Sequence, residues 1–403
     1  MTLRSLATLA LLLLAVSSFA ADPERAFVTT VAGQAGVAGF ADGSTAAATF
    51  NRPTWLDVVR GAGDGASPGD LYVIDRVNDA IRHVSGGTVK TLQVARGYYD
   101  LSTMVHFDFG GPFGGGIVVE PAAAGCGGGP WDRGMFVAAT GSQQLALVSP
   151  LGMLGARDDV SPLIGTGAPG AVDGSDTTSS FNNPTGVALS WEYPSFDLAR
   201  ARSIYVADSG NHTIRRIGFV LSFEACPQAR IVSTYAGSAG MPGAADGPAA
   251  TARFREPRGV AAGPDGSVYV ADTGNHTIRR IAPDGTVTTI AGQPGVAGSS
   301  DGPAREARLN APSGIDVNAR GELFIADTGN HTIRMLTTDG RLVTIAGAPG
   351  TAGFSDGPAD AARFNGPVGV RLAADGSLYV ADTSNNVIRR LGPAPSRRRS
   401  VRK

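Results

Sequence analysis

The sequence predicts an all-β fold, a six-bladed β-propeller with four antiparallel strands in each blade. Three observations carry this prediction: a five-residue apolar motif occurs six times, Asp-Gly turns separate apolar segments, and the N-terminal segment matches the ends of later repeats. Regular repetition of several short strands is typical of propellers. The six copies of the motif are Leu71–Asp75, Met135–Ala139, Ile204–Asp208, Val268–Asp272, Leu323–Asp327 and Leu378–Asp382.

Each repeat carries signals for four strands, here called A to D. In the fourth repeat, the apolar segment Gly259–Ala262 is strand A, and the turn Asp265-Gly266 leads into the recurring motif, which is strand B. Asp-Gly between apolar segments is a strong hairpin signal. Strand C is Thr277–Ile281, and a second Asp-Gly turn precedes strand D, Thr286–Ile290. Strands A and B are almost continuously apolar, which indicates sheets that are buried on both faces.

The N-terminus is predicted to close the ring. Strand D follows strand C in the first five repeats, but the sixth repeat ends at Leu391 without one. The segment Phe27–Gly33 ends in Thr-Thr-Val-Ala-Gly, which matches Thr288–Gly292. We therefore expect the N-terminal strand to join the last blade as its outer strand and to remove an exposed sheet edge.

The repeat also resembles a known family. Its turn reads Asn-His-Thr at Asn211, Asn275 and Asn330, and Ile-Arg follows each of these triplets. This pattern resembles the NHL repeat, which is named after an Asn-His-Leu core. The first, second and sixth repeats depart from it, with Asn78-Asp79, Ser142-Gln143 and Asn385-Asn386. The resemblance covers about residues 27–391 and implies the propeller fold. It leaves function open, because proteins with such propellers include extracellular adhesion proteins, bacterial sensor domains, RNA-binding regulators and an α-amidating lyase.

The predicted domain organisation has three parts. Residues 1–21 read as a signal peptide, with Arg4 before an apolar run that ends in small residues. Residues 22–392 form the propeller, and residues 393–403 form a disordered basic tail. We expect a protein that is secreted, extracellular or in the lumen of the secretory pathway, without a membrane span after processing. An uncleaved N-terminal anchor on a sensor domain is the alternative.

The amino-acid composition indicates a folded protein and bears on which classes of partner it can bind. The chain has 403 residues, of which 42% are hydrophobic and 17% charged, enough to bury a core. The formal net charge of −1 gives no electrostatic case for nucleic-acid binding by the whole chain. We expect a monomer.

The D-to-A loops share a pattern of spaced glycines followed by aspartate. The structural interpretation is a compact loop in which Phe50, Phe181, Phe254, Leu309 and Phe364 fill the gaps between blades. The functional interpretation is a crown of loops that forms a ligand surface, with calcium bound by the aspartates. These are Asp42, Asp173, Asp246, Asp301 and Asp356.

Histidines recur at one turn. His212, His276 and His331 occupy the same B-to-C position in successive blades, which raises the alternative of a zinc site. Equivalent atoms in neighbouring blades are too far apart for a shared ion, so each histidine is expected to hydrogen bond within its own blade. The aspartate that ends strand B is expected to accept hydrogen bonds from its own turn. The strand C arginines pair with carboxylates or form a basic rim.

The second repeat departs most from the pattern. Ala139 replaces the aspartate that ends strand B elsewhere, and the preceding loop lacks the spaced glycines. Departures from a repeat indicate either drift or a specialised site. The first choice for ligand contacts is therefore the set Tyr98, Tyr99, Asp100, His106 and Asp108.

Two covalent features are predicted. Cys126 and Cys226 fall in loops on one face of adjacent blades, which makes them a disulfide pair in an oxidising compartment. The Asn-His-Thr triplets are also glycosylation sequons, with Asn211, Asn275 and Asn330 as candidate acceptors.

Two function classes remain. The first is a secreted scaffold that presents its loop face to a protein or glycan ligand. The alternative is a metal-dependent propeller enzyme of the lyase or lactonase-like kind, with calcium or zinc in the channel. The starts of the A strands offer no set of acids or histidines, which favours the first class. No cofactor and no catalytic residue is predicted.

Overall fold

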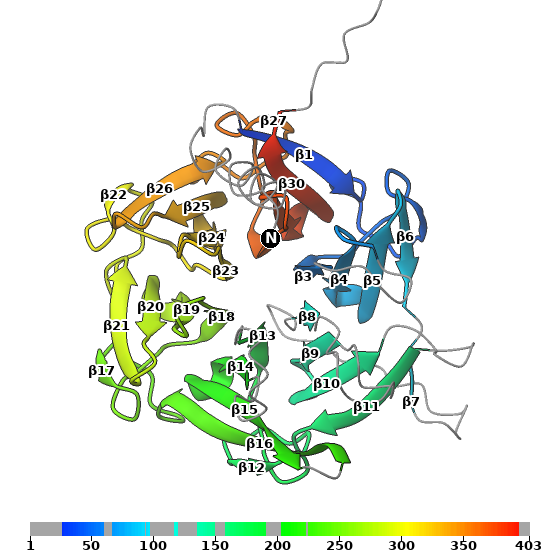
Figure 1. Ribbon diagram of the computed structural model, residues 1–403. Coiled ribbons are helices and arrows are strands. Elements are labelled where there is room, and N and C mark those ends of the chain that lie inside the picture. The colour runs from blue at the N-terminus through cyan, green and yellow to red at the C-terminus, as the bar shows by residue number, and fades with distance from the viewer. Residues whose placement is uncertain are drawn as a thin grey trace, which may run out of the picture.

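The computed structural model describes residues 26–59, 67–92, 94–96, 117–119, 135–149, 158–190, 203–222 and 225–394. These residues form six sheets, which lie radially around a common axis (Figure 1). The predicted all-β propeller is confirmed. The prediction of four strands in each blade is wrong, because every sheet contains a fifth strand. No helix in the described part of the chain is long and apolar enough to cross a membrane.

Strands A to D of each blade run in order from A, nearest the axis, to D, towards the outside. Blade 1 contains β3 (Pro53–Val58), β4 (Leu71–Asp75), β5 (Ala80–Ser85) and β6 (Thr88–Thr91). Blade 2 contains β8 (Ile117–Val119), β9 (Met135–Ala139), β10 (Gln144–Ser149) and β11 (Asp158–Ile164). Blade 3 contains β13 (Pro184–Leu189), β14 (Ser203–Asp208), β15 (Thr213–Ser222) and β16 (Ala225–Gly237).

The remaining blades follow the same order. Blade 4 contains β18 (Pro257–Ala262), β19 (Val268–Asp272), β20 (Thr277–Ile281) and β21 (Thr286–Ala291). Blade 5 contains β23 (Ile315–Val317), β24 (Leu323–Asp327), β25 (Thr332–Leu336) and β26 (Arg341–Ala346). Blade 6 contains β28 (Pro367–Leu372), β29 (Leu378–Asp382), β30 (Val387–Pro393) and β1 (Ala26–Ala32). Short 3-10 helices join strands B and C: η2 (Arg76–Asn78), η3 (Ser209–Asn211), η4 (Thr273–Asn275), η5 (Thr328–Asn330) and η6 (Thr383–Asn385).

The fifth strand of five blades comes from the D-to-A loop. Only two residues of each loop pair, antiparallel, with the outer strand of the blade. Such a short pairing covers the outer sheet edge, which otherwise offers unpaired backbone groups. The five are β2 (Gly43–Ser44), β12 (Gly174–Ser175), β17 (Gly247–Pro248), β22 (Gly302–Pro303) and β27 (Gly357–Pro358). In blade 2 the fifth strand is instead β7 (Val94–Arg96), parallel to β11.

The N-terminal strand lies in the sheet of the last blade. β1 runs antiparallel to β30, with Val28 opposite Leu391 and Thr30 opposite Arg389. On its other side β1 pairs with β27. The first and last strands of the described chain therefore lie side by side in one sheet (Figure 1).

The core lies between neighbouring blades. Strand B is buried over its whole length in β4, β9, β14, β19 and β24 because both of its faces pack against other sheets. The side chains predicted to fill the gaps are fully buried, which confirms the structural interpretation of the loops. They are Phe50, Phe181, Phe254, Leu309 and Phe364.

Close approach of the A strands requires glycine. A Cβ atom on Gly259 would lie 2.1 Å from the carbonyl oxygen of Ser313 in the next blade. Gly186, Gly314 and Gly369 have equivalent contacts of 2.2–2.5 Å with the following blade. The corresponding residue of blade 1 is Trp55, which is buried.

Candidate functional site

A buried aspartate anchors the B-to-C turn, as blade 4 shows. The Asp272 side chain is fully buried and accepts hydrogen bonds from Arg279 Nη1 (2.9 Å), Asn275 Nδ2 (2.7 Å) and the backbone N–H of Arg255 (2.8 Å). Burial raises the pKa of this carboxyl to about 6, although these three donors and the positive charge of Arg279 act in the opposite direction. The prediction that this aspartate binds its own turn is confirmed.

The other side of the same guanidinium holds the loop. Arg279 Nη2 donates to Asp246 Oδ1 at 2.7 Å and to the carbonyl of Ala245 at 2.9 Å. Its charged group lies 5.1 Å from the ring centre of Phe254. Asp246 also accepts the backbone N–H of Thr289 on strand D. One arginine thus ties strand B, strand C and the D-to-A loop together, and charge-assisted bonds of this kind are strong.

The same aspartate–arginine–aspartate network occurs in five blades. Each central arginine side chain is fully buried, whereas the side chain of the loop aspartate is 40–51% exposed. Every loop aspartate therefore already neutralises a cation, which favours the structural interpretation over a calcium site. Among the residues that the structure describes, no group of three or more His, Cys, Asp or Glu side chains could hold a metal. The sets are Asp75–Arg82–Asp42, Asp208–Arg215–Asp173, Asp272–Arg279–Asp246, Asp327–Arg334–Asp301 and Asp382–Arg389–Asp356.

The candidate glycosylation sites lie inside this network. Asn211, Asn275 and Asn330 are buried, and each side-chain Nδ2 donates both to the aspartate of its turn and to a loop carbonyl. A glycan on Nδ2 would remove one of these donors and would have to pass through packed protein. The expectation that the sequons carry glycans thus conflicts with the folded structure.

The histidines hydrogen bond across the seams between blades. His212, His276 and His331 adopt left-handed backbone conformations. Each Nδ1 atom accepts a backbone N–H of the following blade, from Glu256 at 3.1 Å, Ala311 at 3.0 Å and Gly366 at 3.0 Å, respectively. The prediction of a bond within the same blade is wrong, because the left-handed turn directs the side chain towards the next sheet.

Non-titrating residues make the same contact at two other seams. Asn386 Oδ1 accepts the backbone N–H of Arg52 at 2.8 Å, and Gln143 Oε1 accepts that of Asn183 at 2.6 Å. A hydroxyl group adds a second bond at these five seams, 2.5–2.7 Å from the proline carbonyl at the start of the next strand A. The donors are Thr140, Ser209, Thr273, Thr328 and Thr383.

Blade 1 departs from this seam pattern. Its turn reads Arg76-Val77-Asn78-Asp79 where blade 4 has Thr-Gly-Asn-His, so arginine replaces the hydroxyl donor and aspartate replaces the histidine. Val77 is 48% exposed. Trp55 also takes the place of a glycine, at a position that packs against the following blade in blades 3 to 6. Comparison of the repeats could have revealed them, but sequence reasoning concentrated on blade 2.

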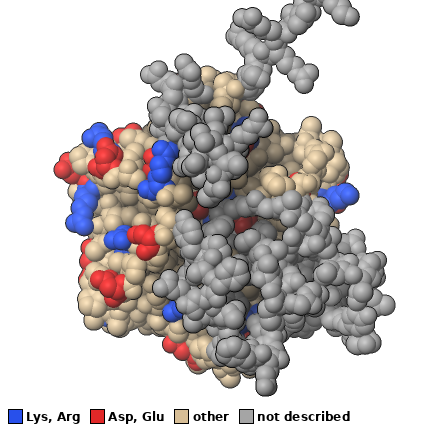
Figure 2. Space-filling view, in the orientation of Figure 1, with Lys and Arg blue, Asp and Glu red and all other residues tan. Residues whose placement is uncertain are grey.

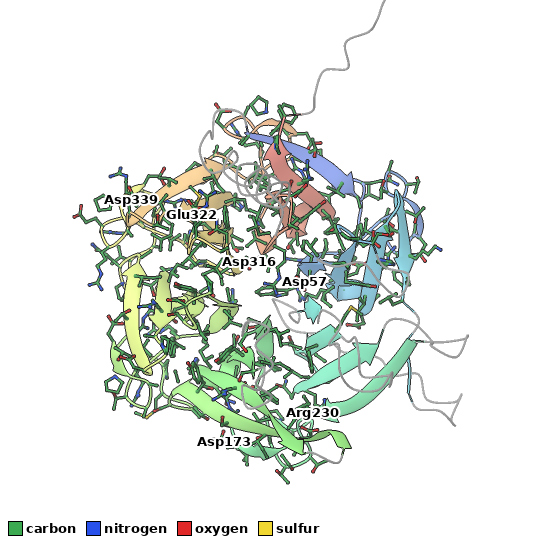
Figure 3. The ribbon with its side chains drawn as sticks, viewed as in Figure 1. Asp57, Asp173, Arg230, Asp316, Glu322 and Asp339 are labelled. Carbon is green, nitrogen blue, oxygen red and sulfur yellow. The ribbon has the colours of Figure 1, made fainter. Side chains whose placement is uncertain are left out.

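The central channel holds an ion cluster. Arg371 of β28 lies 3.0 Å from Asp57 of β3 and 3.6 Å from Asp316 of β23, and it donates to the carbonyl of Val187 of β13. Figure 3 shows both aspartates pointing towards the axis from different blades. All three charged side chains are at least 93% buried. The sequence analysis considered only the starts of the A strands and did not anticipate this cluster, whose members each lie four residues after the proline that begins the A segment.

Other predicted site residues lie outside the described part of the chain. These are Tyr98, Tyr99, Asp100, His106, Asp108 and Cys126, together with the predicted signal peptide and residues 395–403 of the predicted tail. Cys226 falls within β16, where the backbone is described but its side chain is not. On the face seen in Figure 2, positive and negative side chains intermingle over the described blades.

Comparison with known proteins identifies the repeat. The NHL repeat model matches residues 254–281, 309–335 and 364–391, which lie in blades 4, 5 and 6. SUPPRESSOR OF QUENCHING 1 of Arabidopsis thaliana is 29% identical over 285 residues, which cover 56% of this chain and 26% of that protein. Teneurin-3 of Danio rerio is 32% identical over 158 residues, covering 34% of this chain and 6% of its own length. The chain thus spans about a quarter or less of these relatives.

Solved structures agree on the fold. A Bacteroides thetaiotaomicron protein of unknown function has a TM-score of 0.62 at 20% identity, covering 91% of this chain and 76% of its own. An auxiliary nutrient binding protein of the same species has a TM-score of 0.60 at 19% identity, with the same coverage.

A third sequence relative also carries the repeat in its name. NHL repeat-containing protein 2 of Bos taurus is 29% identical over 264 residues, which cover 57% of this chain and 34% of that protein. The chain therefore contains NHL repeats and has a β-propeller fold.

Proposed function

We propose that the chain is exported and acts as a six-bladed binding scaffold, closed by its N-terminal strand, whose loop face binds a protein or glycan ligand. The signal-peptide pattern of residues 1–21 supports export. Two solved proteins of the same fold are described as auxiliary nutrient binding proteins, so the fold is compatible with binding. Loops on a rigid scaffold are common places for recognition.

The observation that carries this proposal is the uneven distribution of the seam contacts. Five seams repeat the same pair of hydrogen bonds. Blade 1 places Arg76, Val77 and Asp79 where the other blades have Ser or Thr, then Gly or Ser, and then His, Asn or Gln. A repeat that is maintained for stability and altered in one place indicates a specialised surface there. The residues Tyr98, Tyr99, Asp100, His106 and Asp108 of the next D-to-A connection remain proposed ligand contacts.

The channel does not support the metal-enzyme alternative. The guanidinium of Arg371 already lies against Asp57 and Asp316, so these carboxylates neutralise a side chain of the protein itself. The same arginine reaches from blade 6 to the Val187 carbonyl of blade 3, so all three charged groups are already engaged within the protein. A ligand would therefore approach the loop face rather than pass along the axis.

The test restores the blade 4 turn in blade 1. The variant Arg76→Thr/Val77→Gly/Asp79→His makes that turn identical to 273–276. Ligands are first selected with the wild-type protein on a glycan array and on a library of extracellular protein domains. We expect the variant to lose binding of the selected ligand while its melting temperature stays the same. Asp360→Asn, an exposed aspartate of the loop before blade 6, serves as the control. Full binding by the restored variant would refute the placement of the site.

A further inference from the structure

The D-to-A loops and the B-to-C turns alternate in one hydrogen-bonded arc on the loop face. In blade 6, Asn385 Nδ2 donates to the carbonyl of Gly353 at 2.8 Å, and the carbonyl of Asn385 accepts the backbone N–H of Gly36 at 3.0 Å. In blade 1, Asn78 Nδ2 donates to the carbonyl of Gly39 at 2.8 Å. The same contacts continue through blades 3, 4 and 5. The loops before blades 6 and 1 are therefore held next to each other by the turn of blade 6.

The loops of this arc are uncharged and expose apolar side chains. The loop segments without any charged residue are 34–41, 166–172, 238–245, 293–300 and 348–355. Eight large apolar side chains are exposed among the described residues, and all but Ile231 lie on these loops or on the turn of blade 1. Four of them gather at blades 6 and 1, where they are 44–55% exposed: Phe354, Val37, Phe40 and Val77. Exposed apolar side chains that gather in one place indicate an interaction site.

The fold does not require these large side chains. The rings of Phe40 and Phe354 lie 5.1 Å from the charged group of Arg82 and 4.7 Å from that of Arg389, respectively. Both arginines also contact a buried core ring at 5.0–5.1 Å. Blades 3 and 4 keep the same arginine network with alanine in the place of the exposed phenylalanine. Val77 likewise stands where blades 3, 4 and 5 have glycine. Large apolar groups that are exposed and dispensable for the network are explained by contact with a partner.

Carboxylates border the apolar side chains on one side. Asp42 and Asp356 follow Phe40 and Phe354 by two residues, and their side chains are 49% and 40% exposed. Each network holds two carboxylates and one guanidinium, so one negative charge is left over in it at neutral pH. The residues after each of these aspartates pair with an outer strand, which places both carboxylates on the outer side of the arc. Arg52 is exposed at the start of strand A, on the inner side. A partner that complements this face therefore carries a basic group on its outer side.

We propose that the four apolar side chains at blades 6 and 1 form the centre of a site for a protein ligand, whose surface presents aliphatic or aromatic side chains beside a basic residue. An apolar centre within a charged rim is typical of protein interfaces. A glycan fits less well, because hydrogen bonds orient a sugar. The polar side chains of these two loop segments are Gln34, Thr351 and Ser355, and the first and last already donate to loop carbonyls. This inference rests on the proposed function and specifies the class of its ligand.

The experiment uses a phage-displayed library of random peptides as the probe, selected on the full chain. Enriched peptides are synthesised, and their binding is measured by fluorescence anisotropy. The variants are Phe40→Ala, Phe354→Ser and their combination, because alanine and serine are the residues of blades 3, 4 and 5 at this position. Met241→Ala removes an exposed apolar side chain from the loop before blade 4 and is the matched control.

We expect the enriched peptides to combine aromatic or aliphatic residues with lysine or arginine. The double variant should bind them about tenfold or more weakly with an unchanged circular dichroism spectrum, and Met241→Ala should bind as the wild type does. Enrichment of acidic peptides, equal binding by the double variant, or no enrichment at all would overturn the proposal. A glycan or protein domain that binds the double variant as well as the wild type, but not the variant with the restored blade 1 turn, would overturn this inference alone and leave the scaffold function standing.

Discussion

The Nδ1 atom of His276 accepts the backbone N–H of Ala311 at 3.0 Å, across the seam between blades 4 and 5. This bond requires an imidazole whose Nδ1 carries no proton. Burial lowers the pKa of His276, and the positive charge of Arg255 lowers it further. The pKa of His212 is lowered by burial and by Arg255 against the opposing effect of Glu256, and burial lowers that of His331. Three seams are therefore held by neutral histidines.

The first prediction is that these seams weaken in acid. Because the pKa values are lowered in the folded state, the unfolded chain binds more protons below its ordinary histidine pKa of 6.5. The histidine contribution to the free energy of unfolding is then complete above that pH and is lost as the pH falls towards the folded values. Protonation removes one acceptor at each seam, an effect of about 1 kcal/mol for each bond.

A matched variant isolates this effect. Asn386 makes the same contact through an amide oxygen, so His212→Asn/His276→Asn/His331→Asn should keep the seams and lose the titration. Urea unfolding of both proteins between pH 7.5 and 5 should give a gap that widens in favour of the variant as the pH falls. Subtracting the two curves cancels the buried aspartates, which are common to both. A constant gap would contradict the role of the histidines.

The sequence alone predicted the features that depend on the local pattern of apolar residues and on the repeat. The strands and the buried Phe50 and Phe181 follow from apolar periodicity and a repeated position. The two-residue fifth strands were missed because their Gly-Ser and Gly-Pro pairs are typical of loops. The channel cluster was missed because the repeats do not share it. Asp57, Asp316 and Arg371 occupy a position that is alanine in blades 3 and 4, and their charges meet only when the A strands converge.

The second prediction is that Asn275 carries no glycan. Its Nδ2 atom is buried and donates to Asp272 and to the carbonyl of Gly243. After expression through a eukaryotic secretory pathway, intact-mass and peptide analysis should show an unmodified asparagine. The control is Asp284→Asn, which creates the same Asn-X-Thr spacing on an exposed turn and should be occupied. Occupancy at Asn275 in natively folded protein would contradict the packing described for this turn.

The third prediction concerns the approach of blades 4 and 5. In Gly259→Ala, the new Cβ would lie 2.1 Å from the Ser313 carbonyl oxygen, so the two A strands must separate. Overpacking of this kind should lower the free energy of unfolding by about 1–3 kcal/mol in chemical denaturation. Gly218→Ala also places alanine in a strand, but its Cβ would meet no atom within 4 Å. A comparable loss in both variants would show that the seam contact is not the cause.

The fourth prediction is that Asp272 and Arg279 are strongly coupled. Arg279→Ala leaves Asp272 buried without its cation, and Asp272→Ala leaves the buried Arg279 with only the partly exposed Asp246 as its counter-charge, so either variant should cost about 3–5 kcal/mol. Blade 2 shows that both can be absent together, because Ala139 and Ala146 occupy the equivalent positions and are fully buried. The double variant should therefore lose much less than the sum of the single variants in a double-mutant cycle.

The exposed pair Arg280–Asp265, whose ions lie 2.9 Å apart in the same blade, provides the comparison. Its side chains are 37% and 45% exposed, so water screens their interaction and their coupling should stay below about 1 kcal/mol. Additive losses for Asp272 and Arg279 would mean that each side chain is held by its other partners. In that case Asp246 and the loop carbonyls, rather than the buried ion pair, would be what fixes Arg279 in the blade.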